Sequence, residues 1–251
     1  MPFNPIARYY DQDDGRITED IPTILGFAQQ TGGPVLDLGA GTGRLTLPLA
    51  QAGYDVTGID SAGDMLVIAR RRVAGAGLAG RVTLVEMDFT QVELDQQFGL
   101  AYCGFNGFLH LIETEDQLAA LRAWRRHLRP DGLLVIDVHN PHIEQLAAAD
   151  GGLTLADRWI DPASGHVIHK LVATEIDLAD QVYTIHRFYD EIGSDSVVRR
   201  TAITFETRIL FRRELALLLQ LAGFQSLRFY GDHDLSPWEA DSPRIIAVAR
   251  P

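Results

Sequence analysis

The chain has 251 residues, which is enough for one sizeable α/β domain or for a domain with an added subdomain. It carries 22 basic and 34 acidic residues, and the resulting formal net charge of −12 argues against a nucleic-acid substrate. No apolar run is long enough to span a bilayer, and the single cysteine, Cys103, excludes an internal disulfide, so a cytoplasmic location without a membrane partner is expected.

The first element expected is a helix, preceded by a polar and irregular stretch at the start of the chain (residues 1–20). The helix is predicted over Ile17–Gln30, with Thr18 as its N-cap. Glu19 and Asp20 fall in its first turn, where acidic side chains interact favourably with the helix dipole. The start of the chain has no basic region followed by an apolar one, so no signal peptide is predicted.

A short buried strand, a glycine-rich turn and a helix follow. The apolar run Val35–Leu38 predicts the strand, and Gly39, Gly41 and Gly43 allow a sharp turn and the close approach of a ligand. Amides at the start of the next helix would face this turn and form a polar pocket. In the dinucleotide-binding fingerprint, the third glycine would stand at the position of Arg44, one residue later than here.

The pattern Gly-x-Gly-x-Gly, preceded by Asp37, resembles the first motif of the class I S-adenosylmethionine-dependent methyltransferases. The resemblance implies an α/β fold with a doubly wound, seven-stranded, mainly parallel sheet, the Rossmann-like methyltransferase fold. It also implies that S-adenosyl-L-methionine is the cofactor. The cofactor-binding residues expected from this segment are Asp37, Gly39, Ala40, Gly41, Thr42 and Gly43.

A second strand is predicted over Tyr54–Asp60. Asp60 would lie beside the glycine turn, because the ends of parallel strands line up, and its carboxylate can accept hydrogen bonds from an adenosine ribose. Nicotinamide enzymes use an acidic residue at this position as well, so Asp60 does not separate them from methyltransferases. The structural alternative is that Asp60 is the N-cap of the next helix, a role for which Ser61 is the other candidate. The resemblance extends through Ser61 to Met65, which would border the adenine, although core packing explains that methionine equally well.

The third strand is predicted over Val82–Glu86, and Asp88 and Phe89 follow it. In the family that the chain resembles, an aspartate here accepts a hydrogen bond from the adenine amino group and the next residue lies against the ring. Both are therefore expected to bind the cofactor. The alternative is an aspartate that only stabilises its own loop.

The fourth strand, expected over Phe98–Cys103, leads into Phe105, Asn106 and His110. The resemblance implies that Phe105 and Asn106 border the sulfonium and the methionine amine, since an aromatic face or a carbonyl oxygen suits a cation. His110 is the first candidate for a general base, because the pKa of imidazole lies near neutrality. The alternative is that His110 belongs to a partly buried turn.

Two further residues are candidates for substrate contact. His139 follows the fifth strand, which is predicted over Leu133–Val138 after a helix over Glu115–Leu128 and a turn. Tyr10 lies in a Tyr-Tyr-Asp segment that resembles one folded over the cofactor in many small-molecule methyltransferases, and packing of the chain's first residues is the alternative. No metal is expected, because no acidic or cysteine partner accompanies the His139/His142 pair.

The pattern changes over residues 153–206, where turn-like stretches separate alternating segments rich in β-branched and aromatic residues. About four antiparallel strands are predicted there, as an insertion that caps the substrate. Side chains such as His186, Arg187 and Tyr189 are candidates for lining its pocket. The methyltransferase core, with its N-terminal arm, takes residues 1–152 and 207–251, and its last elements are predicted at Arg213–Ala222, Phe224–Tyr230 and Ile245–Ala249.

The predicted function is transfer of the S-adenosylmethionine methyl group to nitrogen, oxygen or carbon of a small-molecule acceptor. The only macromolecular partner expected is a second copy of the chain in a homodimer. Two alternatives stay open. An oxidoreductase that uses NAD would share the strand, turn and helix but would need a glycine in place of Arg44. A non-catalytic S-adenosylmethionine-binding protein would keep the glycine turn and Asp60.

Overall fold

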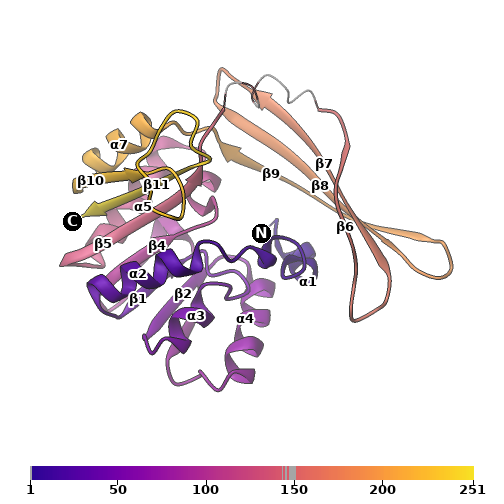
Figure 1. The fold of residues 1–251 in the computed structure, drawn as a ribbon, viewed down its shortest axis with the longest axis horizontal. Helices are drawn as coiled ribbons and strands as arrows, with labels where there is room; N and C mark the ends of the chain where they lie inside the picture. The colour runs from indigo at the N-terminus through magenta and orange to yellow at the C-terminus, as the bar shows by residue number, and fades with distance from the viewer. Residues whose placement is uncertain (1, 143, 145, 147–150) are drawn as a thin grey trace.

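Two β-sheets and a helical N-terminal segment build the fold in the computed structural model, which describes residues 2–142, 144, 146 and 151–251 (Figure 1). Within these residues the first sheet has seven strands, in the order β10-β11-β5-β4-β1-β2-β3. Strands β1 to β5 pair in parallel, and β11 is antiparallel to both β5 and β10. The strands are β1 (Val35–Leu38), β2 (Val56–Asp60), β3 (Val82–Glu86), β4 (Phe98–Cys103), β5 (Leu128–His139), β10 (Gln225–Tyr230) and β11 (Arg244–Arg250). The predicted doubly wound, mainly parallel sheet is confirmed.

Helices cover both faces of this sheet, as its apolar strands require. Every residue of β1 and β4 is buried, which is the pattern of a parallel strand covered on two sides. On one face α2 (Ile21–Thr31) and α3 (Thr46–Gln51) pack on the sheet; on the other, α5 (Thr114–Arg126) and α7 (Arg212–Leu221) do. Over the stretches of chain that the structure describes, no helix combines the length and the apolar character needed to cross a membrane.

The carboxyl ends of the five parallel strands meet along one edge of the sheet. In an open α/β sheet this is the edge at which ligands bind. The residues that end β1, β2 and β3 lead into the glycine turn, into α4 (Gly63–Gly75) and into the short helix η3 (Phe89–Gln91). Strand β4 leads into η4 (Gly107–His110), and β5 ends at His139.

The insertion forms a second sheet. Among the described residues it has four antiparallel strands in the order β6-β7-β8-β9, which confirms the predicted antiparallel β insertion. The strands are β6 (Thr154–Ile160), β7 (Val167–Asp177), β8 (Val182–Ile192) and β9 (Val198–Arg208). Figure 1 shows this sheet extending away from the core beyond the carboxyl edge of the first sheet, with helix α1 between them.

Residues 2–20, called the N-terminal arm below, lie against the insertion sheet. The arm contains η1 (Asn4–Ile6), α1 (Ala7–Tyr10) and η2 (Asp14–Arg16). The ring of Tyr9 stacks on that of Tyr189, with 4.7 Å between centroids, and Ile6 packs in the same apolar cluster. Asp13 accepts hydrogen bonds from Lys170 Nζ at 2.7 Å and from the Tyr189 hydroxyl at 2.6 Å.

The arm also contacts the core, so it connects the two sheets. The Thr42 hydroxyl donates to Asp11 Oδ1 at 2.6 Å, and the Arg72 guanidinium lies 3.0 Å from the same oxygen. Arg44 donates two hydrogen bonds of 2.6 Å to the carboxylate of Asp20. Both members of this second pair are buried, with 8% and 1% of their side chains exposed.

Two predicted elements differ from the structure. The first residues were expected to be irregular, but they form short helical turns because Ile6 and Tyr9 bury their side chains against the insertion sheet. Helix α2 consequently begins at Ile21 rather than near Thr18. Strand β5 begins at Leu128, which pairs with Phe98, so the expected turn before residue 133 lies within an irregular part of the strand.

Candidate active site

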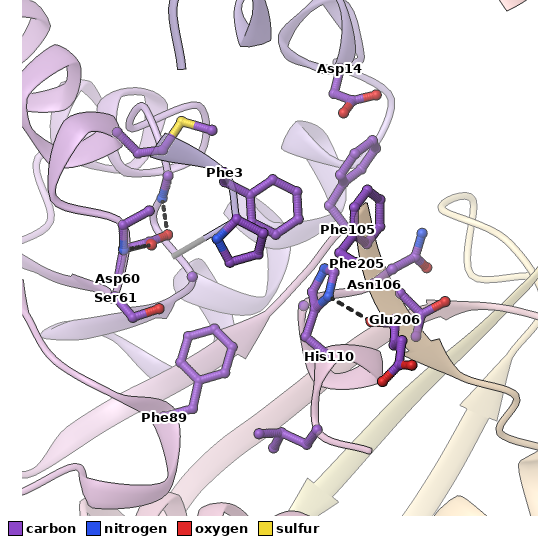
Figure 2. Close-up of a pocket in the computed structure, with 18 of the residues that line it drawn as sticks. Phe3, Asp14, Asp60, Ser61, Phe89, Phe105, Asn106, His110, Phe205 and Glu206 are labelled. Carbon is purple, nitrogen blue, oxygen red and sulfur yellow. Dashed lines mark hydrogen bonds between the residues drawn. The ribbon is translucent and has the colours of Figure 1, made fainter. Parts of the chain in front are cut away.

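A cavity of about 550 Å³ lies at the carboxyl edge of the first sheet, and residues of the arm and of the insertion sheet also line it. Ligand pockets of this kind commonly occupy 300–1,000 Å³ by order of magnitude, roughly the size class found here. Figure 2 shows Asp60, Ser61 and Phe89 on one side of the cavity and His110, Phe205 and Glu206 on the other. The predicted site residues that line it are Tyr10, Gly39, Gly41, Asp60, Ser61, Met65, Asp88, Phe89, Phe105, Asn106, His110 and His139.

The glycine turn forms one wall of the cavity. Gly39 has φ +86°, and a Cβ placed on it would lie 3.0 Å from Phe89 Cζ. Both the backbone conformation and the neighbouring ring therefore require a glycine. Gly43 also has a positive φ, of +83°, but a Cβ there would meet the following helix and not the cavity wall. It would lie 2.9 Å from Leu47 Cδ1.

Four predicted cofactor residues lie outside the cavity lining. The side chain of Asp37 is buried beneath the turn, where it accepts a 2.6 Å hydrogen bond from the Thr46 hydroxyl. Burial raises the pKa of Asp37 to about 6, against the opposing effect of that hydrogen bond. Gly43 packs on the following helix, and the Thr42 hydroxyl donates its hydrogen bond to Asp11 of the arm. Ala40 is buried, and its amide lies 2.9 Å from the Ile59 carbonyl oxygen. Their role in cofactor binding stays a prediction.

Asp60 links the glycine turn to helix α4. Its Oδ2 accepts a hydrogen bond from the Gly41 amide at 2.8 Å, and its Oδ1 accepts one from the Ala62 amide at 2.7 Å. Burial raises the pKa of Asp60, and the backbone amides that donate to it oppose the shift. A carboxylate oxygen can accept more than one hydrogen bond, so Asp60 can serve the backbone and a ligand in the cavity together.

Asp88 and Phe89 follow β3 at the same edge. Asp88 Oδ1 accepts hydrogen bonds from the amide and the hydroxyl of Thr90, at 2.8 and 2.7 Å, so it caps η3. Phe89 is held through its carbonyl, which accepts a 3.0 Å hydrogen bond from Trp124 Nε1. The predicted loop role of Asp88 is therefore present, and its second oxygen has no protein donor within the described residues.

The turn after β4 is strained and firmly held. Phe105 has φ +51° and Asn106 has φ +66°, a left-handed conformation that costs energy for residues other than glycine. The carboxylate of Asp137 accepts hydrogen bonds from the Phe105 amide at 3.4 Å and from Arg244 Nε at 2.5 Å. Asn106 Oδ1 in turn accepts the His139 amide at 2.7 Å, which fixes the side chain at the cavity wall.

His110 connects the core to the insertion sheet. Its Nδ1 lies 3.3 Å from the Glu206 carbonyl oxygen, which can only accept, so Nδ1 carries the proton and Nε2 keeps a lone pair (Figure 2). The rings of Phe3 and Phe205 lie 5.1 and 5.6 Å from the imidazole. Burial lowers the pKa of His110, and the Glu206 carbonyl opposes that shift.

The other two catalytic candidates also reach the cavity. Burial, with the charge of Arg244, lowers the pKa of His139 to about 4, so this ring is neutral at physiological pH. Burial, together with the nearby carboxylate of Asp14, raises the pKa of Tyr10 far above its ordinary range. Tyr10 therefore remains a phenol, which can donate a hydrogen bond but does not act as a base.

Several lining residues escaped the sequence reasoning. Phe3 and Thr207 carry no motif, and only the folded chain brings them to the cavity. Of the insertion residues singled out, Arg187 lines the cavity, Tyr189 is buried under the arm, and His186 bonds Thr204 on the opposite face. No group of three or more histidine, cysteine or acidic side chains in the described residues is arranged to hold a metal ion.

Comparison with known proteins identifies the family. The pattern of a family described as "Methyltransferase domain" matches residues 35–132. A cypemycin N-terminal methyltransferase from Streptomyces sp is 34% identical over 217 residues, which cover 86% of this chain and 82% of that protein. The chain is a class I S-adenosylmethionine-dependent methyltransferase.

Further relatives agree with this assignment. A glycine/sarcosine N-methyltransferase from Aphanothece halophytica is 27% identical over 218 residues, covering 86% of this methyltransferase and 75% of the relative. The structure of the CcbJ methyltransferase from Streptomyces caelestis superposes with a TM-score of 0.80 at 26% identity, and the match covers 94% of each chain.

The cavity of this methyltransferase fits the cofactor of its family. At Gly39 the backbone is exposed to the cavity without a Cβ, so a ligand can approach it closely. Asp60 and Asp88 offer carboxylate oxygens from neighbouring strand ends, which suits a ligand with hydroxyl and amino donors. The chemistry of the lining therefore agrees with S-adenosylmethionine as the cofactor.

Proposed function

We propose that this enzyme methylates a nitrogen atom of a small-molecule acceptor that binds between the core and the insertion sheet. The observation that carries the proposal is one cavity in which the glycine turn, Asp60 and the free Nε2 of His110 come together. Nitrogen is favoured because the relatives described above are named for an N-terminal methyl transfer and for N-methylation of glycine and sarcosine.

The cofactor residues follow from the cavity lining. Gly39 and Gly41 would hold the cofactor through the backbone, Asp60 would accept from the ribose hydroxyls, and Asp88 from the adenine amine. Phe105 and Asn106 would border the methionine end. S-adenosylmethionine supplies an activated methyl group, so the protein's main task is alignment, which is worth roughly 7–11 kcal/mol.

His110 is the base in this proposal. An ammonium acceptor must lose a proton before its nitrogen can attack, and the lone pair on His110 Nε2 can take that proton. The carbonyl of Glu206 holds the ring in the required tautomer. The rings of Phe3 and Phe205 shield the imidazole from water and thereby keep it neutral.

The proposal assigns one role to the insertion sheet and another to the methyltransferase core, as expected from the sequence. The sheet formed by residues 153–206 caps the acceptor, while residues 1–152 and 207–251 bind the cofactor. A cytoplasmic location, a homodimer and the absence of a nucleic-acid partner remain predictions, the first supported by the single buried cysteine.

Calorimetry with S-adenosylhomocysteine and with NAD tests the cofactor assignment. We expect binding of the first only, and an Asp60→Asn variant should bind about tenfold more weakly, since one hydrogen-bond acceptor becomes a donor. The matched control is Asp64→Asn, an exposed carboxylate in the first turn of α4. Binding of NAD, or no binding of S-adenosylhomocysteine, would overturn the assignment.

Transfer of a labelled methyl group to a panel of amines, alcohols and carbon acids tests the reaction. Label on amines supports N-methylation, and label on alcohols or carbon acids alone contradicts it. Tight S-adenosylhomocysteine binding without transfer to any acceptor would favour the non-catalytic alternative.

A further inference from the structure

The side-chain amide of Asn106 offers its nitrogen, and not its oxygen, to a ligand in the cavity. Two protein donors occupy Oδ1: the His139 amide at 2.7 Å and Arg244 Nη2 at 3.3 Å. Neither donor can accept a hydrogen bond, so the orientation of the amide is fixed. The amide nitrogen has no hydrogen-bond partner among the residues that the structure describes. Since Asn106 is half-buried and lines the cavity, its two N–H groups are open to a ligand.

This orientation depends on Arg244, which lies outside the cavity lining. Arg244 is the first residue of β11 and pairs in register with His139 at the end of β5. Its guanidinium joins two acceptors, because Nε donates to Asp137 Oδ1 at 2.5 Å while Nη2 donates to Asn106 Oδ1. A planar fork of donors can hold two groups at once, whereas the ammonium of a lysine is a single point of charge.

Asp137 keeps Arg244 in place as a charged partner. Its carboxylate is 1% exposed and also lies 3.3 Å from His233 Nε2. Burial raises the pKa of Asp137, but the hydrogen bond from His233 and the charge of Arg244 together bring it below its ordinary value. The buried carboxylate is therefore ionised. Asn106 has a left-handed backbone, which persists only where its surroundings fix it, and this pair supplies part of that support.

The order of the strands places Asn106 beside the methionine end of the cofactor. Asp60 and Asp88 follow β2 and β3, while β1, which leads into the glycine turn, lies between β2 and β4. A ligand whose adenosine is held by Asp60 and Asp88 therefore crosses the glycine turn and reaches the turn after β4 with its methionine end. That end carries an ammonium group, which only donates, and a carboxylate, which only accepts. The open N–H groups of Asn106 match the carboxylate.

From these contacts we infer that Asn106 donates a hydrogen bond to the methionine carboxylate of the cofactor, and that Arg244 is the positioning residue that orients Asn106 for this task. The sequence alone favoured the Asn106 oxygen as the group facing the cationic part of the cofactor. In the structure that oxygen is already used by two donors. The inference rests on the cofactor assignment in the proposed function and adds the group that Asn106 recognises.

Calorimetry with three adenosine derivatives tests which group Asn106 serves. S-adenosylhomocysteine has the carboxylate and the ammonium, its decarboxylated analogue 5′-(3-aminopropylthio)-5′-deoxyadenosine keeps the ammonium, and 5′-methylthioadenosine has neither. Asn106→Asp tolerates the left-handed backbone but places a negative charge where the N–H groups were. We expect its affinity for S-adenosylhomocysteine to fall about tenfold or more, and that for the decarboxylated analogue to stay the same or rise. Tighter binding of S-adenosylhomocysteine would mean that Asn106 serves the ammonium, which contradicts the inference.

Two variants of β11 test the role of Arg244. Arg244→Lys keeps a charge beside Asp137 but cannot also reach Asn106, so the affinity for S-adenosylhomocysteine should fall about tenfold and that for 5′-methylthioadenosine should not change. Arg250→Lys is the matched control at the other end of the strand, where Arg250 donates to the Asp131 carbonyl, and it should change neither affinity. In an Asn106→Ala background, Arg244→Lys should cause no further loss, because Arg244 acts through Asn106.

The outcomes separate this inference from the proposed function. If Arg244→Lys weakens S-adenosylhomocysteine and 5′-methylthioadenosine equally, or if its effect adds fully to that of Asn106→Ala, Arg244 has a structural role alone and the inference is wrong, while the cofactor assignment stands. If the unchanged protein binds none of the three adenosine derivatives, the cofactor assignment fails and the inference fails with it.

Discussion

Arg44 shows how one residue separates two cofactor classes that share a strand, a turn and a helix. It occupies the position at which a dinucleotide-binding turn carries its third glycine. Here its side chain bonds both oxygens of Asp20 and the carbonyl of Ile17, and it lies 5.1 Å above the Phe105 ring. Through these contacts the Arg44 side chain connects the glycine turn to the start of α2 and to the strained turn after β4.

At the same scale, the proposed base gives a prediction on activity. We expect His110→Gln to lower kcat/KM by a factor of about 10² to 10⁴, the contribution of a general base, while the affinity for S-adenosylhomocysteine changes little. His186→Gln is the matched control, because His186 lies on the opposite face of the insertion sheet. Steady-state methyl transfer and calorimetry measure the two effects.

The pH dependence of the same reaction follows from the direction of the shift. Burial lowers the pKa of His110 below its ordinary value of 6.5, so the base is neutral above that lowered pKa and is lost by protonation below it. The acid limb of the kcat/KM profile should therefore lie below pH 6.5 and should disappear in His110→Gln. An unchanged limb in the variant would assign the titration to another group.

Residues with a motif could be predicted, and residues without one could not. Asp60 and Asp88 follow strands in a pattern that resembles a known family, and both reach the cavity. Thr207 and Phe3 belong to no motif, and alternation along a strand does not reveal which face a cavity will occupy. For the same reason His186 and Arg187 were equal candidates, although adjacent strand residues point to opposite faces.

At the scale of elements, the N-terminal arm is held by buried ion pairs in addition to the apolar contacts of Ile6 and Tyr9. The side chains of Asp13 and Lys170 are 6% and 12% exposed and lie 2.7 Å apart. Asp14 pairs with Arg187, whose side chain lines the cavity. The arm therefore positions part of the cavity wall, and loosening it should affect the site.

We expect Asp13→Asn to destabilise the protein by about 2 to 3 kcal/mol, because Lys170 would keep a buried charge with a weakened partner. Amide exchange in residues 2–16 should become faster. Asp55→Asn is the control, since Asp55 and Arg81 form an exposed pair that contributes at most about 1 kcal/mol. Urea unfolding and hydrogen exchange measure the changes, and equal losses in both variants would contradict a structural role for the buried pair.

The elements themselves were predicted closely where the pattern of apolar residues was clear. The four strands of the insertion and the pair β10 and β11 lie where alternation and turn residues indicated. The arm was missed because its few apolar residues, such as Ile6 and Tyr9, are buried only by contact with a sheet about 160 residues later in the chain. No local pattern can report such a contact.

At the scale of the whole molecule, the cavity lies where three parts meet: the core sheet, the insertion sheet and the arm that connects them. Lining residues come from all three, including Phe3 and Tyr10 of the arm. A ligand that fills the cavity would contact each part at once. Cofactor binding should therefore stabilise the connection between the sheets as well as the core.

S-adenosylhomocysteine at 100 times its dissociation constant should raise the free energy of unfolding by about 2.7 kcal/mol. It should also slow tryptic cleavage of the arm after Arg8 and Arg16, whose side chains are 60% and 53% exposed. Arg81 is an exposed residue outside the cavity lining, so the rate of cleavage after it reports only the stabilisation of the whole fold by the ligand. Protection of the arm beyond that of Arg81 is expected, because the ligand touches the arm directly. Equal protection at all three sites would mean that the bound cofactor makes no contact with the arm.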